Sequence, residues 1–210
     1  MFVWFVELAN EHELEIYSGD HKGFSGIAVF SLDKQNRYFL EKRWAEDGDV
    51  FTAFMMNPSK AAHNISDPTV DQLINVAKKN GCNALNVVNV SSVIEGNSKN
   101  LIDTQFQYNQ VNWAFVSSAL RQSKYVFLGW GVKGQLGIRN QLKMQPSIKH
   151  IFETEKEKLY VYEVLKSIDQ KFKRLNLHYA PHPRPQANIK KYIEAPIVRI
   201  ENLEFEMLFM

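Results

Sequence analysis

Apolar and polar positions alternate along the chain in a pattern that changes character after Trp44. Before this point, two β-type runs, Phe24–Leu32 and Arg37–Trp44, flank the polar sequence Asp33-Lys34-Gln35-Asn36. Such runs around a short polar turn predict an antiparallel hairpin. After it, short apolar runs alternate with stretches of helical spacing. We therefore expect residues 1–48 to form an N-terminal β extension and residues 49–190 to form the core.

The core region predicts strands and helices in alternation. Strands are expected at Val50–Met56, Ala84–Val90, Tyr125–Trp130, Ile148–Phe152 and Leu177–Ala180. Helices are expected from Pro68 to Gly81, with Asp67 as the N-cap, and at Thr104–Gln122 and Gln135–Met144. This alternation predicts right-handed crossovers and a single α/β domain over residues 1–210, in which helices cover both faces of a mostly parallel sheet in a three-layer α/β/α arrangement. The C-terminal sequence IVRIENLEFEMLF fits a strand and a helix equally well.

Recognition-type side chains follow four of these strands. They are Asn57-Pro58-Ser59, Asn89, Trp130 between two glycines, and His182-Pro183-Arg184. Each has a simpler explanation: a turn former, a loop cap, a core side chain and an exposed turn, respectively. Open α/β sheets bind ligands at the carboxyl ends of their strands, where all four groups would meet. We therefore expect one shared pocket at this edge.

The types of side chain at these positions indicate what the pocket would bind. Amides can read the edge of a planar heterocycle, an aromatic ring can stack on it, and a histidine can meet developing negative charge. The other reaction classes have less support. A nucleophile elbow and a phosphate-binding P-loop are absent from the sequence, and Gly129-x-Gly131-x-x-Gly134 lies late in the chain for a dinucleotide motif.

Composition and charge narrow the picture slightly. The 210 residues are 45% hydrophobic and 23% charged, which is ordinary for a globular protein. The net charge of +2 requires any phosphate-binding surface to be local. Basic residues that could surround the pocket mouth are Arg139, Lys143, Arg184, Lys190 and Lys191. A solvated charged face explains these residues equally well.

Cofactors and membranes are not expected. The single cysteine, Cys82, excludes an internal disulfide, a zinc ribbon and a four-cysteine iron–sulfur cluster. The pairs His63/Asp67 and His178/His182 are poorly placed as metal ligands, so we expect no metal and no organic cofactor. The N-terminal sequence MFVWFVELANEHELE has no basic region before its apolar start, and acids follow soon after. We expect a cytoplasmic protein.

Several motifs in fixed order carry a family resemblance. Arg37-Tyr38-x-Leu40-x-x-Arg43-Trp44, Asn57-Pro58-Ser59, Asp67-Pro68-Thr69, Asn89 and His182-Pro183-x-Pro185 are similar to those of a bacterial and phage family with a domain of unknown function. The resemblance spans roughly residues 37 to 186. It implies membership of that family and no particular activity.

A more distant resemblance is to the uracil-DNA glycosylase superfamily. Its ordered motifs are similar to MMNPS, NVVNV, VFLGWG and PHPRP in this chain. The resemblance implies that Asn57 holds the attacking water, that Asn89 reads the base edge and that His182 bonds the base oxygen that becomes anionic. Ser59 and Trp130 would lie beside the substrate, and Arg184 would contact DNA phosphate or fill the space of a flipped base.

This chain departs from the superfamily at two places in the first motif. Met55 or Met56 stands where those enzymes carry glycine, and Asn57 stands where most carry aspartate. An amide cannot accept a proton, so catalysis would rest on water positioning and electrostatics.

Three functions remain open at this point. The first is recognition of a nucleobase in DNA, with or without hydrolysis of its N-glycosidic bond. The second is a non-catalytic module that binds nucleic acid or a nucleotide on the same fold. The third is a small-molecule enzyme on this scaffold, because a fold does not fix a function.

Overall fold

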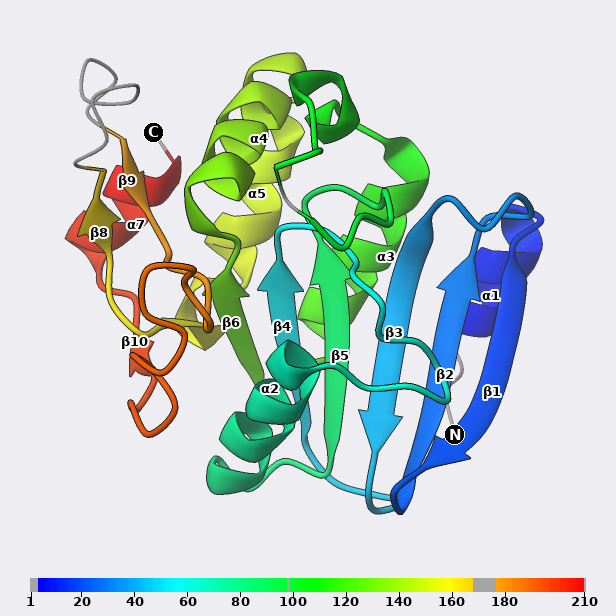
Figure 1. Ribbon diagram of the computed structural model, residues 1–210. Helices are drawn as coiled ribbons and strands as arrows, with labels where there is room; N and C mark the ends of the chain where they lie inside the picture. Colours follow the sequence, from blue (N-terminus) through cyan, green and yellow to red (C-terminus); the bar gives the residue numbers. More distant parts are fainter. Residues whose placement is uncertain (1–3, 98, 168–176, 210) are drawn as a thin grey trace.

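A computed structural model describes residues 4–97, 99–167 and 177–209. Its main feature is an eight-stranded sheet in the order β1-β2-β3-β5-β4-β6-β7-β10, beside which lies a two-stranded sheet, β8-β9 (Figure 1). The strands are β1 Glu15–His21, β2 Phe24–Phe30, β3 Arg37–Arg43, β4 Val50–Met55, β5 Ala84–Asn89, β6 Tyr125–Gly129, β7 Leu159–Val161, β8 Leu165–Lys166, β9 His178–Tyr179 and β10 Val198–Arg199. The helices are α1 Trp4–Glu11, α2 Pro68–Lys79, α3 Gln110–Arg121, α4 Gly131–Met144, α5 Ser147–Thr154 and α7 Asn202–Phe209, with short 3-10 helices η1 Asp103–Phe106 and η2 Lys156–Lys158.

The large sheet is parallel at its centre and antiparallel at its flanks. Strands β5, β4, β6 and β7 run parallel to one another. Strands β1, β2 and β3 form an antiparallel meander that continues antiparallel onto β5, and β10 is antiparallel to β7. The predicted hairpin is therefore confirmed as β2 and β3. The expectation of a mostly parallel sheet holds only for the four central strands.

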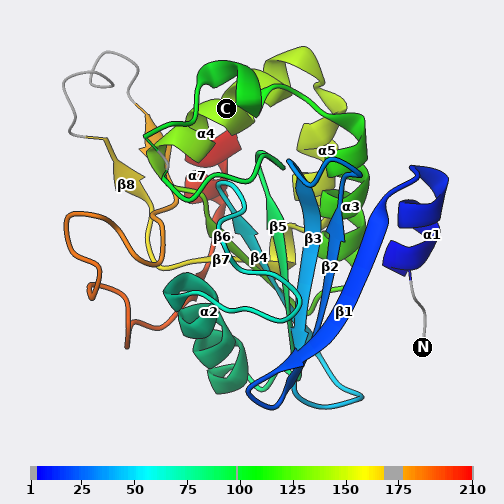
Figure 2. The ribbon, with the colours of Figure 1, turned by 45° about the vertical axis from the view of Figure 1, so that its right-hand side comes forward.

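Alternate side chains of the central strands pack into two different cores. In β4, Phe51, Ala53 and Met55 belong to the core that contains the buried side chains of α2. Phe54 belongs to the other core, to which α1, α3, α4, α5 and α7 contribute. Figures 1 and 2 show α2 on one side of the sheet and α3 on the other. This alternation follows from the period of two along a strand and accounts for the continuous apolar run of β4.

Helix α2 follows the predicted start and stop signals. The Asp67 carboxylate accepts hydrogen bonds from the backbone N–H groups of Thr69 and Val70, both at 2.9 Å, and Pro68 occupies the first turn. Gly81, with φ of 74°, lies just beyond the end of the helix. The left-handed conformation that stops a helix is cheapest for glycine, which explains why the prediction succeeded here.

One predicted strand is wrong, and another lies outside the main sheet. The sequence around Ile148–Phe152 is helix α5, in which Ile148 and Phe152 are buried on one face. A short apolar run cannot by itself distinguish a strand from one side of a helix. The run Leu177–Ala180 contributes only β9, which pairs antiparallel with β8 outside the main sheet. The strand that extends the parallel part of the sheet beyond β6 is β7.

Three other elements differ from the expected ones in extent. The predicted helix Thr104–Gln122 is divided into η1 and α3, and α4 begins at Gly131 rather than at Gln135. The ambiguous C-terminal sequence forms both a strand, β10, and a helix, α7.

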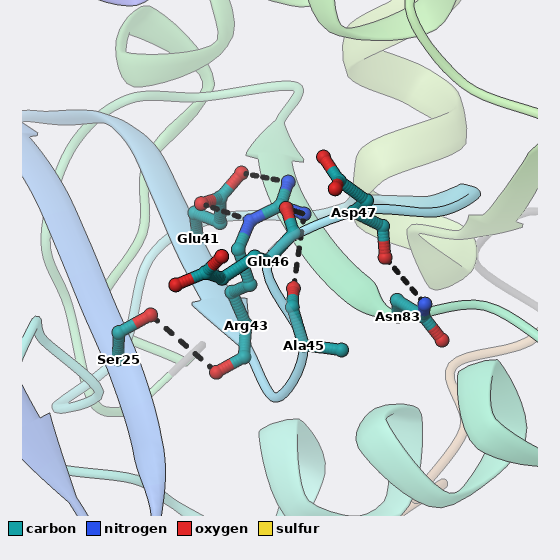
Figure 3. Close-up of polar contacts among 7 residues, drawn as sticks. All are labelled: Ser25, Glu41, Arg43, Ala45, Glu46, Asp47 and Asn83. Atoms are coloured by element: carbon teal, nitrogen blue, oxygen red, sulfur yellow. Dashed lines mark hydrogen bonds and ion pairs between the residues drawn. The ribbon is translucent and has the colours of Figure 1, made fainter. Parts of the chain in front are cut away.

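The sheet edge at which the parallel strands begin is held by local polar contacts. The Arg43 guanidinium donates two hydrogen bonds of 3.1 Å to the Glu41 carboxylate and others to the backbone oxygens of Ala45 and Glu46 (Figure 3). In the same loop, Asn83 donates to the backbone oxygen of Asp47. Arg43, one of the residues of the family resemblance, therefore has a structural role at the edge away from the predicted pocket.

Candidate functional site

A cavity of about 770 Å³ opens at the carboxyl ends of β4, β5 and β6. Strand β4 is followed by α2, which leads to β5, whereas the chain after β6 leads to β7 on the other side. Neighbouring strands whose connections leave in opposite directions create a crevice between their loops, where α/β proteins bind ligands. The six residues proposed from the sequence all line this cavity: Asn57, Ser59, Asn89, Trp130, His182 and Arg184.

Asn57 is fixed immediately after β4 by its own amide. Its Nδ2 donates to the backbone oxygens of Pro58, at 2.7 Å, and Glu95, at 2.8 Å. These bonds use both amide hydrogens, so the Oδ1 atom remains to accept a bond from a ligand or a water. Asn57 therefore forms a turn and also borders the cavity, together with the Ser59 side chain.

Asn89 is the most unusual polar group of the cavity. It is the last residue of β5 and only 1% exposed, yet neither Oδ1 nor Nδ2 has a hydrogen-bond partner among the described residues. Its backbone oxygen does have one, because Asn112 Nδ2 donates to it at 2.9 Å. A buried polar group without a partner costs about 1–3 kcal/mol. Such a cost at the wall of a cavity is accounted for if a ligand supplies the missing partners.

The loop that carries His182 is fastened to α2 and α4. Gln72 Nε2, on α2, donates to the backbone oxygens of Pro183 at 3.1 Å and Tyr192 at 3.2 Å. The N–H of Gly131, at the start of α4, donates to the backbone oxygen of Ala180 at 2.9 Å. These bonds explain how a residue far along the chain comes to lie beside the ends of the central strands.

The Nδ1 atom of the His182 ring is held by the backbone of Arg184. It lies 3.0 Å from the Arg184 nitrogen, from which it can accept, and 3.1 Å from the Arg184 oxygen, to which it can donate, so each neutral tautomer has a partner. The tautomer in which Nδ1 accepts carries its hydrogen on Nε2. Burial lowers the pKa of His182 below the ordinary value, which favours this neutral form at pH 7. In that tautomer, His182 is a neutral hydrogen-bond donor at the cavity.

The lowered pKa of His182 has a consequence for stability. The unfolded chain binds a proton at this position at a higher pH than the folded chain does, so the free energy of unfolding should fall as pH decreases from 7 through the ordinary histidine value of 6.5. In the His182→Asn variant, Asn Oδ1 can replace Nδ1 as acceptor. We expect the free energy of unfolding of this variant, measured in urea at pH 5 to 8, to decrease less steeply as the pH falls. Contributions of His63 and His178, whose pKa values burial also lowers, are common to both proteins and cancel. Equal slopes for the two proteins would contradict the expectation.

Trp130 lies behind the cavity wall and does not present a ring face to a ligand. Its side chain is fully buried, and its Nε1 donates to Gln135 Oε1 at 2.8 Å. The indole packs edge-on against Phe54, with 5.2 Å between ring centroids, and against Phe209. Its contribution to the cavity is therefore support. Tyr179 is a partly exposed aromatic residue that does line the cavity and was not singled out from the sequence.

Basic residues outnumber acidic ones around the cavity. Arg37, Lys99, Lys133, Arg184 and Lys191 line it, against Asp67 and Glu95. Of the basic residues proposed from the sequence, Arg184 and Lys191 are in this set, and Lys190 is exposed in the same loop. Arg139 and Lys143 lie along α4 and are not lining residues in the described structure.

Arg37 and Asp67 are cavity residues that sequence reasoning did not assign to the site. Arg37 is only 2% exposed, its Nη1 donates to the backbone oxygen of Ala61, and its Nε has no partner among the described residues. Burial lowers the pKa of Arg37 to about 10, and the negative charge of Asp67 acts in the opposite direction. Both residues belong to the motifs of the family resemblance, and that membership was the sequence signal that could have assigned them to the site.

The described residues offer no metal centre. Among residues 4–97, 99–167 and 177–209, no group of three or more His, Cys, Asp or Glu side chains could hold a metal ion. Within the same ranges, no helix is long and apolar enough to span a bilayer. Cys82 is buried, and burial raises the pKa of its thiol to about 11, which makes it a poor nucleophile.

Comparison with known proteins identifies a family but no activity. The family model described as "Protein of unknown function (DUF1643)" matches residues 37–184, which is more than half of the chain. No curated protein matches. The first resemblance noted from the sequence is therefore confirmed, and the resemblance to uracil-DNA glycosylases has no support from these comparisons.

Proposed function

The chain belongs to this DUF1643 family, and from the geometry of its cavity we propose that it recognises a nucleobase in nucleic acid and hydrolyses the N-glycosidic bond of that nucleotide. The proposal includes a three-layer α/β/α fold of the uracil-DNA glycosylase type. The cavity lies at the sheet edge where such a fold would place its ligand, and its volume of about 770 Å³ is within the range of small-molecule sites.

The observation that carries the proposal is the buried amide of Asn89. One unpartnered acceptor and one unpartnered donor lie side by side on a rigid strand. A pyrimidine or purine edge offers a neighbouring donor and acceptor in one plane, so a base can satisfy both atoms at once. A ligand that lacks this pattern would leave at least one buried atom unpaired.

His182 supplies the second element of the proposal. In the tautomer in which Nδ1 accepts from the Arg184 N–H, the neutral Nε2–H can donate to a base oxygen without being a strong acid. When the N-glycosidic bond breaks, its electron pair moves into the base and negative charge develops on that oxygen. A fixed donor at this position stabilises the transition state more than the ground state, which is the condition for catalysis.

The charge around the cavity favours a nucleic acid over a free base. Three of the lining basic residues, Lys99, Arg184 and Lys191, are at least partly exposed and lie where a phosphate backbone could reach them. Lys191 forms an ion pair with Glu163, with 2.6 Å between Nζ and Oε1, whereas the Arg184 guanidinium has no carboxylate partner among the described residues.

A second candidate function is binding without catalysis. The Asn57 amide cannot accept a proton, and its hydrogens are committed to Pro58 and Glu95. If no other group activates water, the same cavity would recognise a base and leave the glycosidic bond intact. The two candidates share the Asn89 contact and differ only in turnover.

The proposed activity can be tested with a panel of single- and double-stranded oligonucleotides that carry uracil or mismatched bases. We expect the protein to release a free base from at least one of them, detected as alkali-sensitive abasic sites. Binding of one base in preference to others, without release, would support the second candidate. Failure to bind any oligonucleotide or nucleoside would contradict both.

Replacement of Asn89 by leucine should separate recognition from stability. Leucine has nearly the same shape and no polar atoms, so the variant should lose base-specific binding while its free energy of unfolding stays the same or rises by about 1–3 kcal/mol. The measurements are base binding by fluorescence anisotropy and urea unfolding.

Asn112→Leu is the matched control for this variant. Asn112 is also a buried amide, only 2% exposed, but its Nδ2 is bonded to the Asn89 backbone oxygen. Its replacement should therefore destabilise the fold. If Asn89→Leu destabilises the protein as much as Asn112→Leu does, then Asn89 has a structural role, and its buried amide no longer supports base recognition.

A further inference from the structure

Hydrolysis of a glycosidic bond needs a group that takes a proton from the attacking water. Asn57, which the resemblance places nearest to this water, cannot take it, because an amide has no useful basicity. The proposed reaction therefore needs a base from elsewhere in the cavity.

Two carboxylates line the cavity, and only one of them has an oxygen without a hydrogen-bond partner among the described residues. In Glu95, Oε1 accepts from the Asn97 N–H at 2.7 Å and Oε2 accepts from Asn100 Nδ2 at 3.3 Å. In Asp67, Oδ1 accepts both N-cap hydrogen bonds, and Oδ2 has no hydrogen-bond partner among the described residues.

The helix cap also gives Asp67 a fixed orientation. Two backbone N–H groups in the first turn of α2 hold Oδ1 from the same side, each at 2.9 Å. A carboxylate held in this way has little freedom to rotate, which is what a group that must meet a water in one geometry requires. The capping function and a catalytic function therefore use different oxygens of the same side chain.

Asp67 also lies within electrostatic reach of two other cavity residues, Arg37 and His182. Its charge interacts with the Arg37 guanidinium and with the His182 ring. It forms an ion pair with neither of them in the described structure, so its lone pairs are not consumed by a cation. The carboxylate thus shares the cavity with the group that would stabilise the leaving base, and its Oδ2 remains available to water.

We propose that Asp67 is the catalytic base of this cavity, which rests on the glycosidic hydrolysis proposed above. Water oxygen attacks C1′ of the sugar while Asp67 accepts one water proton. The C1′–N bond breaks and its electron pair leaves with the base, whose oxygen accepts a hydrogen bond from the Nε2–H of His182. The departing base then takes a proton from solvent. The products are the free base and a sugar with a C1′ hydroxyl group.

The competing explanation is that Asp67 only caps α2, and substitutions that preserve the cap distinguish the two. Asparagine and serine are as effective as aspartate at an N-cap, but neither is a base. We expect Asp67→Asn and Asp67→Ser to fold normally and to release the base ~10²–10⁴-fold more slowly, the usual contribution of a general base. Binding of an oligonucleotide that contains 2′-fluoro-2′-deoxyuridine, which resists hydrolysis, should be unchanged.

Two further measurements would show no effect if Asp67 had only a structural role. The wild-type rate should decrease at acidic pH, and this decrease should be absent in Asp67→Asn, which has no ionisable group at this position. Formate should partly restore the rate of Asp67→Gly, because a small carboxylate can enter the space that is vacated, and glycine is tolerated at an N-cap. Asn109→Ser, at the N-cap of α3, is the matched control and should change neither rate nor pH profile.

The outcomes separate this inference from the proposed function. Slow release with intact binding in the Asp67 variants supports the inference. Wild-type rates in Asp67→Asn, or an equal loss of binding and release, would overturn it and leave the proposed function standing. A wild-type protein that binds the oligonucleotides but releases no base from any of them overturns both the inference and the hydrolysis, and it leaves base recognition intact.

Discussion

Replacement of His182 by asparagine is expected to slow base release by ~10²–10³-fold, the usual effect of removing one donor from a developing oxyanion. Asparagine Oδ1 can accept the Arg184 N–H in place of Nδ1, so the loop should keep its conformation. What the variant lacks is the Nε2–H that points away from this bond. Single-turnover release of the base, measured at saturating protein, reports this step directly.

Glutamine at the same position provides the complementary test. Its amide nitrogen can reach the place of Nε2, so His182→Gln should retain more activity than His182→Asn. His150→Asn is the control, because His150 is a well-exposed residue of α5. If His182→Gln and His182→Asn are equally active, the ring is only part of the loop structure. If both lose activity because the protein unfolds, the same conclusion holds.

Replacement of Trp130 by alanine should have the largest effect on stability. The side chain is fully buried and contacts aromatic rings of β4, α5 and α7, so its removal leaves a large cavity. We expect the free energy of unfolding to decrease by about 3–5 kcal/mol in urea. The Gln135 Oε1 atom also loses its donor, which adds to the cost.

Trp44→Ala is the comparison for this variant. Trp44 is only partly buried, although its Nε1 also donates, to the backbone oxygen of Cys82 at 3.1 Å. It should therefore destabilise the fold less than Trp130→Ala. A Trp130→Ala protein of nearly normal stability and poor ligand binding would show that the indole acts on the ligand, as the sequence first suggested.

The parts of the fold that sequence predicted well are those decided by local interactions. Asp67, Pro68 and Gly81 specify the ends of α2 within a few residues of chain. The convergence of Asn57 and Asn89 was also predictable, because parallel neighbouring strands end at the same edge. His182 reached the same cavity for a different reason than expected, since β9 is not part of the main sheet.

The parts that sequence predicted poorly depend on contacts between distant segments. Helix α5 buries Ile148 and Phe152 in the core that contains Phe54 of β4, and no local signal distinguishes this helix from a strand. Strand β1 is an edge strand whose alternating exposure includes many polar residues, so its apolar run is too weak to detect. The burial of Arg37 depends on the loop that supplies Ala61, which lies 24 residues away in the chain.

Helix α7 lies beyond the segment shared with the family, which ends at residue 184, yet it completes the wall behind the cavity. Gln135 joins the two parts, because its Oε1 accepts from Trp130 and its Nε2 donates to the Leu208 backbone oxygen. Phe209 also packs against the Trp130 indole. The unit that folds is consequently larger than the unit that family resemblance delimits. A truncated protein cut to the shared segment would expose the apolar back of Trp130 to water and would be prone to aggregation.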